Sequence, residues 1–185
     1  MKRLVLTLVI TVLGISLGAS QNYIAKSSTS ELSVSGTSSL HDWECSVKDF
    51  TGEIDAVITD GAVSAINNYN FTFKVKSLES GKGGMNKKMY EALKEEDYPV
   101  ITYKGSEVVF INGQAKFKGK MTMAGVTKYF ETMIDVTYEG GNIKLEGSKA
   151  FKLADFSIKP PTAMFGTIKT GEEVSIHYNI LLLTK

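Results

Sequence analysis

The chain has 185 residues, 43% of them hydrophobic and 22% charged, and its formal net charge is +1. The near-neutral charge excludes a strongly basic nucleic-acid-binding surface, and the hydrophobic fraction excludes a disordered chain. A single cysteine, Cys45, cannot build a disulfide framework or a cysteine-rich zinc site. The composition therefore predicts one globular domain with a sizeable core.

The first 20 residues have the layout of a secretory signal peptide. Lys2 and Arg3 precede an apolar segment over residues 4–17, and residues 18–20 are small. The apolar segment is shorter than the about 20 residues that a membrane span needs. We expect cleavage after Ser20, a mature domain over residues 21–185 without a transmembrane segment, and a periplasmic location. A retained N-terminal anchor is the alternative.

Apolar and polar residues alternate along most of the mature chain, which is typical of half-buried strands. The alternation covers residues 71–76, 115–123, 130–138, 143–151 and 174–182. Turn signals separate these segments: Asp60-Gly61, Asn112-Gly113, Ala124-Gly125 and Gly140-Gly141. Short turns favour an antiparallel meander over alternating strands and helices. We expect an all-β fold of about eight antiparallel strands, closed into a barrel that hides its edges.

Two further features follow from spacing. Cys45 alternates with Trp43 and Val47, which predicts that the thiol is buried. Residues 83–96 have helical spacing instead, with Met85, Met89 and Leu93 on one face. We expect this short helix to cap the barrel. It could act as a lid that swings on the glycines before it, or as a fixed plug.

Several motifs along the mature chain are similar to those of one family. They occur in residues 35–43, 50–54, 97–103, 118–128 and 171–176, and the most specific reads Gly-Lys-Met-Thr-Met-Ala-Gly-Val-Thr-Lys from Gly119 to Lys128. In these motifs the chain resembles the YceI-like family. The resemblance implies a lipocalin-like barrel that binds polyisoprenoid or other long-chain lipids. The helix departs from the pattern, because Asn86, Lys87, Lys88 and Met89 stand where many relatives have Asp-x-His-Leu.

A lipid carrier needs a dry, apolar cavity, and the strand periodicity indicates which side chains face inward. Methionines can adapt to an irregular prenyl or acyl chain. The predicted ligand-binding residues of the barrel interior and helix are Phe71, Phe73, Val75, Met85, Met89, Leu93, Phe117, Met121, Met123, Phe130, Ile134, Leu145, Tyr178 and Ile180. The alternative for each of them is that it fills the core. Lys82, Lys87 and Lys88 could meet a polar headgroup or belong to a solvated helix face.

His41 has Ser38, Ser39 and Asp42 close by in sequence, which suggests a nucleophile and base. The chain has no G-x-S-x-G motif, however, and adjacent residues on a strand point to opposite faces. A structural role for His41 is therefore the better interpretation. His177 falls on the polar face of the last strand, and two isolated histidines predict no metal site.

The sequence as a whole predicts a periplasmic, non-catalytic carrier of a long-chain apolar lipid of the polyisoprenoid, isoprenoid quinone or fatty-acid type. It predicts no cofactor other than such a bound lipid and no nucleic-acid partner, and it leaves a homodimer open. The first alternative is a filled barrel that acts through its surface as an interaction or stress-protective module. The second is a hydrolase that acts through His41.

Overall fold

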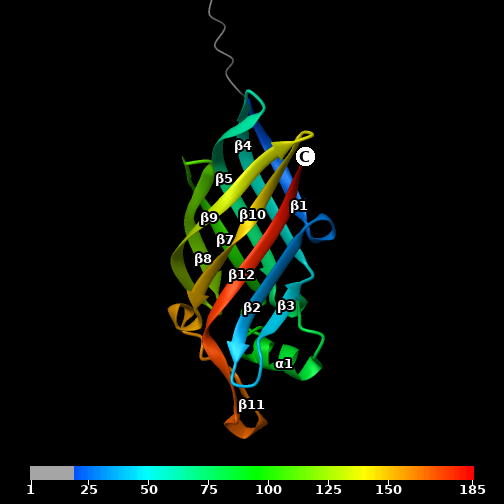
Figure 1. The fold of residues 1–185 in the computed structure, drawn as a ribbon, viewed down its shortest axis with the longest axis vertical. Helices are drawn as coiled ribbons and strands as arrows, with labels where there is room; N and C mark the ends of the chain where they lie inside the picture. The colour runs from blue at the N-terminus through cyan, green and yellow to red at the C-terminus, as the bar shows by residue number, and fades with distance from the viewer. Residues whose placement is uncertain (1–18) are drawn as a thin grey trace, which may run out of the picture.

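The computed structural model describes residues 19–185, so the predicted signal peptide lies almost wholly outside the described residues (Figure 1). Eight strands form a closed ring in which every pairing is antiparallel. Around the ring they are β1 (Ser20–Lys26), β4 (Phe50–Thr59), β5 (Ala62–Lys74), β7 (Val100–Ile111), β8 (Gln114–Met123), β9 (Val126–Glu139), β10 (Asn142–Lys152) and β12 (Ile168–Thr184). This barrel confirms the predicted fold class.

The remaining strands extend one end of the barrel. They are β2 (Glu31–Ser38), β3 (Trp43–Val47), β6 (Leu78–Glu79) and β11 (Thr162–Ala163). Along one edge of the long β12, β2 pairs with residues 170–179 and β1 with residues 182–184. The chain then passes through β3, which pairs with β2 and β6, before it returns to the ring at β4.

The short connections follow the turn chemistry predicted from the sequence. Four hairpins turn through two residues that both have positive φ, as type I′ turns require. Their φ values are 53° and 74° at Asp60-Gly61, 50° and 85° at Asn112-Gly113, 50° and 80° at Ala124-Gly125, and 58° and 82° at Gly140-Gly141. The 3₁₀ turns are η1 (Ser27–Thr29), η2 (Val75–Ser77), η3 (Leu153–Phe156) and η4 (Met164–Gly166).

The predicted helix is present as α1 (Gly83–Ala92) and lies at the end of the barrel that β3 and β11 also occupy (Figure 1). It is shorter than the expected span to residue 96, because Lys94 adopts a left-handed conformation with φ of 54°. A left-handed residue directly after Leu93 stops the helix and turns the chain toward β7.

The barrel interior differs between its two ends. Away from α1 it is filled by side chains that are at most 1% exposed, among them Tyr23, Ile54, Ala56, Ile143 and Leu182. None of these residues borders the cavity that occupies the end nearer α1. The molecule is therefore packed at one end and hollow at the other.

Candidate ligand-binding site

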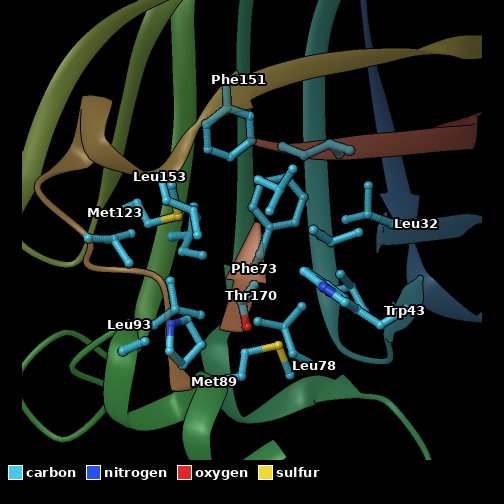
Figure 2. A pocket seen from close by; sticks show the side chains of 18 of the residues that line it. Leu32, Trp43, Phe73, Leu78, Met89, Leu93, Met123, Phe151, Leu153 and Thr170 are labelled. Carbon is cyan, nitrogen blue, oxygen red and sulfur yellow. The ribbon is translucent and has the colours of Figure 1, made fainter. Parts of the chain in front are cut away.

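The cavity at the α1 end has a volume of about 460 Å³. This lies within the range of roughly 300–1,000 Å³ that small-molecule pockets occupy. Figure 2 shows Leu78, Met89 and Leu93 at one end of the cavity and Phe151 at the other. At the α1 end the lining includes Leu40, Lys82 and Ala163, which come from the β2–β3 loop, the segment before α1, and β11. All three residues are exposed although they border the cavity, so the cavity opens between their segments, and we call this opening the mouth.

Most of the residues predicted to bind a ligand line this cavity. They are Phe71, Phe73, Met85, Met89, Leu93, Met121, Met123, Phe130, Ile134, Leu145, Tyr178 and Ile180. Val75 and Phe117 are 1% and 0% exposed but are not among the lining residues. Phe117 belongs to the filled end, where its ring lies edge-on to Tyr69 with centroids 4.9 Å apart. Val75 lies in η2, where its backbone amide donates to the carbonyl of Pro99.

Several lining residues were not among those predicted from the sequence. They are mainly Leu32, Val34, Leu40, Trp43, Val47, Leu78, Ile101, Phe151, Leu153, Ile158, Ile168, Val174 and Ile176. Those on strands share the parity of neighbouring inward residues, so the alternation held a signal for them. Leu40, Leu153 and Ile158 come from loops and turns, where no periodicity marks the inward face.

Trp43 forms part of the wall through a close approach to the backbone. A Cβ atom at Gly36 would lie only 2.5 Å from Cζ2 of the Trp43 ring, so the indole packs directly on the glycine. The indole Nε1 donates to the carbonyl of Thr37 at 2.9 Å. The ring therefore has its polar atom satisfied by the protein and presents carbon to the cavity.

Three hydroxyl groups that line the cavity, those of Tyr103, Thr132 and Tyr178, are also bonded to the protein. The Tyr178 hydroxyl donates to the carbonyl of Met133 at 3.0 Å and lies 2.7 Å from Oγ1 of Thr132. The Tyr103 hydroxyl donates to the carbonyl of Phe130 at 3.2 Å. Burial raises the pKa of both tyrosines, which keeps them neutral. Because these hydroxyls already have partners in the protein, the surface that these residues present to a ligand is largely apolar.

The charged residues that line the cavity are Lys74, Lys82, Lys88 and Lys149, and no described carboxylate joins them. Lys74 is paired with Asp49 at 2.5 Å, and Lys88 with Glu91 at 2.8 Å. The Lys149 ammonium lies 5.9 Å from the centroid of the Phe130 ring, a cation–π distance. Lys82 lies at the mouth, with Nζ 3.4 Å from Nε2 of His41.

Helix α1 is fastened to the barrel by polar contacts. The buried Asn86 accepts bonds from the Ser80 amide at 2.9 Å and the Ser80 hydroxyl at 2.6 Å, and it donates to Glu79 at 2.6 Å. The Tyr90 hydroxyl lies 3.0 Å from the carbonyl of Lys76 and 2.8 Å from that of Leu78. The helix bounds the cavity without filling it, since Met85 and Met89 are only half-buried and border open space.

The neighbours of His41 do not form a nucleophile and base. The Ser38 hydroxyl donates to the carbonyl of His41 at 2.7 Å and makes no bond to its ring. The ring Nδ1 of His41 lies 2.6 Å from the carbonyl of Asp42. The serine–histidine contact that does occur joins Ser35 and His177 at 2.8 Å, on the solvent-exposed face and outside the cavity.

Other expected features can be placed as well. Cys45 is buried, as predicted, and burial raises the pKa of its thiol to about 11, which makes it a poor nucleophile. Among residues 19–185 no three histidine, cysteine or acidic side chains gather as a metal would require. Within the same residues no helix has the length and apolarity to cross a membrane.

Known proteins share this fold. The crystal structure of Burkholderia cenocepacia BcnA matches with a TM-score of 0.72 at 17% identity, over 85% of this chain and 98% of that one. A polyisoprenoid-binding domain from Saccharophagus degradans matches with a TM-score of 0.62 at 13% identity, over 90% of this chain and 100% of that one.

A third structure is the Campylobacter jejuni YCEI protein, with a TM-score of 0.62 at 16% identity, over 100% of this chain and 99% of that one. No curated protein is similar enough to this chain to match it. The YceI-like domain matches residues 23–182, which is nearly all of the described sequence. The chain therefore belongs to the YceI-like family.

Proposed function

We propose that this protein is a non-catalytic carrier that holds a long-chain apolar lipid in its barrel, in the periplasm. The observation that carries the proposal is the cavity of about 460 Å³, whose lining is largely aromatic and aliphatic and in which the hydroxyls of Tyr103, Thr132 and Tyr178 are bonded to the protein. A polar substrate would find few free partners there, whereas each buried CH₂ group of a lipid gains roughly 0.8 kcal/mol before ordering costs.

The chemistry of the lining supports a chain-like ligand of the polyisoprenoid, isoprenoid quinone or fatty-acid type. Met85, Met89, Met121 and Met123 line the cavity together, and methionine adapts to irregular hydrocarbon. The Saccharophagus degradans relative is described as a polyisoprenoid-binding domain. The filled-barrel alternative requires a packed interior, and the α1 end of this barrel is hollow.

The test is native mass spectrometry of protein expressed from the full chain and purified without detergent, followed by organic extraction. We expect a discrete added mass that extracts as a prenyl or acyl lipid. A bare protein that also takes up no prenol, quinone or fatty acid when these are offered would overturn the proposal. Intact mass also shows whether residues 1–20 have been removed, which tests the signal peptide.

Two methionines on adjacent strands provide a matched control. Met121 is 4% exposed and borders the cavity, whereas Met133 is 37% exposed on the outer face of β9. Met121→Trp should fill part of the cavity and reduce the bound lipid at least tenfold. Met133→Trp should leave it unchanged, and thermal unfolding of both variants shows that they remain folded.

A further inference from the structure

Two of the three most exposed large apolar side chains among residues 19–185 lie at the tip of the hairpin that joins β11 to β12. In η4, Phe165 is fully exposed and Met164 is 68% exposed. Leu40, in the neighbouring β2–β3 loop, is 66% exposed. We call these three residues the apolar tip. Its hairpin protrudes from the α1 end of the barrel, opposite the end that carries the C-terminus (Figure 1).

The backbone of the hairpin holds these side chains in an unfavourable conformation. Met164 and Phe165 have φ values of 49° and 55°, and Gly166 follows at 90°. Bulky residues adopt the left-handed region at a cost, and such strain clusters at functional sites. Glycine or asparagine would satisfy the same turn more easily, so the turn geometry does not account for a methionine and a phenylalanine here.

The apolar tip is continuous with the mouth of the cavity. Ala163 and Ile168, on either side of η4, both line the cavity, as does Leu40. The two parts of the tip are bonded together, because the Ser39 amide donates to the carbonyl of Lys169 at 2.9 Å and the Lys169 amide donates to the Ser39 hydroxyl at 3.0 Å. A molecule leaving the cavity at this end passes the tip.

The charges on the hairpin of the apolar tip are positive, whereas the β2–β3 loop carries one exposed acidic residue, Asp42, two residues after Leu40. Residues 157–171 contain Lys159 and Lys169 and no acidic residue. Lys82 lies at the mouth, next to His41. Among residues 19–185 no carboxylate lies within 4.0 Å of its ammonium group. Exposed apolar side chains flanked by lysines match the interface of a bilayer that contains anionic lipids.

We propose that the apolar tip inserts into the surface of an anionic lipid bilayer and seats the mouth of the cavity on it. This inference rests on the proposed lipid-carrier function and assigns the place where cargo is exchanged. An apolar cargo would then pass between bilayer and cavity without crossing water. Three side chains are too few for a protein interface, which buries about 1,200 Å² or more, but are enough to anchor a tip among headgroups.

Flotation with vesicles tests this inference on protein expressed from the full chain, with intact mass used to check that residues 1–20 are absent. We expect binding to vesicles of phosphatidylglycerol and phosphatidylethanolamine, and weaker binding to phosphatidylcholine alone. The tip variant, Met164→Asn combined with Phe165→Asn, places at both positions asparagine, which tolerates a positive φ. It should lower the partition coefficient onto the anionic vesicles at least tenfold. Ile111→Asn, at the far end of β7, should not lower it.

A fluorescent fatty acid, added without vesicles, separates the two proposals. The tip variant should retain the affinity of the unchanged protein for this probe. Unchanged vesicle binding in the tip variant, or none by the unchanged protein, would overturn membrane docking while leaving lipid binding intact. If the unchanged protein binds no vesicles but forms a dimer that the tip variant cannot form, membrane docking is overturned, and the tip instead contacts a second copy of the chain. If neither the unchanged protein nor the tip variant binds the fluorescent fatty acid, the carrier function is refuted.

Discussion

Gly119 occupies one of the closest contacts in the barrel wall. A Cβ atom there would meet the hydroxyl of Tyr69 and would lie 2.5 Å from the backbone carbonyl of Lys104. The carbonyl belongs to the paired strand β7 and cannot move without breaking the ladder. Gly119→Ala should therefore destabilise the protein by about 1–3 kcal/mol, as overpacking does. Urea unfolding measures the difference.

Gly83 provides the control for that substitution. It lies at the start of α1, its φ is not positive, and a Cβ atom there would meet nothing within 4 Å. Gly83→Ala should change the free energy of unfolding by less than about 1 kcal/mol. Equal losses in the two variants would show that the contact with Tyr69 and Lys104 is not what excludes a side chain at Gly119.

Tyr69 makes the stability of the protein sensitive to high pH. Burial raises the pKa of its hydroxyl to about 12, whereas an unfolded tyrosine loses its proton near pH 10. Between these values the unfolded chain binds fewer protons than the folded one, so stability falls as pH rises. Tyr69 should account for a loss of about 2–3 kcal/mol at pH 12.

Tyr69→Phe tests this assignment. Tyr103 and Tyr178 also have raised pKa values and add to the loss, so the variant should reduce the slope without abolishing it. Urea unfolding at pH 9, 10, 11 and 12 gives the free energies. Parallel pH profiles for the variant and the unchanged protein would refute the role of Tyr69.

Helix α1 is attached by the buried amide of Asn86 together with the Tyr90 hydroxyl. Asn86→Ala removes the bonds to the half-buried Ser80 and to the exposed Glu79, and a net hydrogen bond of this kind is worth about 0.5–1.5 kcal/mol. Because these bonds join α1 to β6 and not to the ring, we expect faster hydrogen exchange in residues 80–93 and little change in β7–β10. Bound lipid should also leave faster.

Lys87→Ala is the matched change on the same helix, because Lys87 is exposed and lies next to Asn86. It should alter neither exchange nor lipid release. If Asn86→Ala behaves like Lys87→Ala, the helix is held by its apolar face and the Tyr90 hydroxyl, without a contribution from Asn86. If exchange instead rises throughout the ring, α1 is integral to the barrel and cannot act as a separate lid.

At the scale of single strands, hairpins and the helix, the sequence predicted the regular elements well. Period-two alternation and dipeptides such as Asn112-Gly113 identified the strands and hairpins, because a single local conformation determines each. It overestimated the length of α1, since the left-handed Lys94 has no strong sequence signal. It also missed β2, β3 and the loops as cavity walls, because which loops converge at one barrel end depends on distant pairings such as Ser38 with Thr170.

Whether an inward side chain faces a cavity or another side chain is a property of the whole molecule. Phe117 and Phe71 both point inward on their strands, yet only Phe71 borders the cavity. Alternation predicts which face of a strand a side chain lies on. It does not predict how far along the barrel axis that side chain lies. That position is fixed by strand register and by how bulky side chains such as Tyr23 fill the opposite end.

The division into a filled and a hollow end predicts that stability and ligand affinity can be changed separately. Ile143 is 0% exposed within the filled end, and Ile134 is 5% exposed and borders the cavity. Ile143→Ala leaves a void among packed neighbours and should cost about 2–5 kcal/mol. Ile134→Ala deletes the same atoms where contacts are already missing on one side, so it should cost less.

Lipid affinity should respond in the opposite order. Ile134→Ala enlarges the cavity and removes ligand contacts, so the dissociation constant for a prenol or fatty acid should rise, whereas Ile143→Ala should leave it unchanged once the folded fraction is accounted for. Fluorescence titration together with urea unfolding gives both quantities for each variant. If the two variants lose stability and affinity in the same proportion, the ends of the barrel are one cooperative core, because a ligand then senses packing anywhere within it.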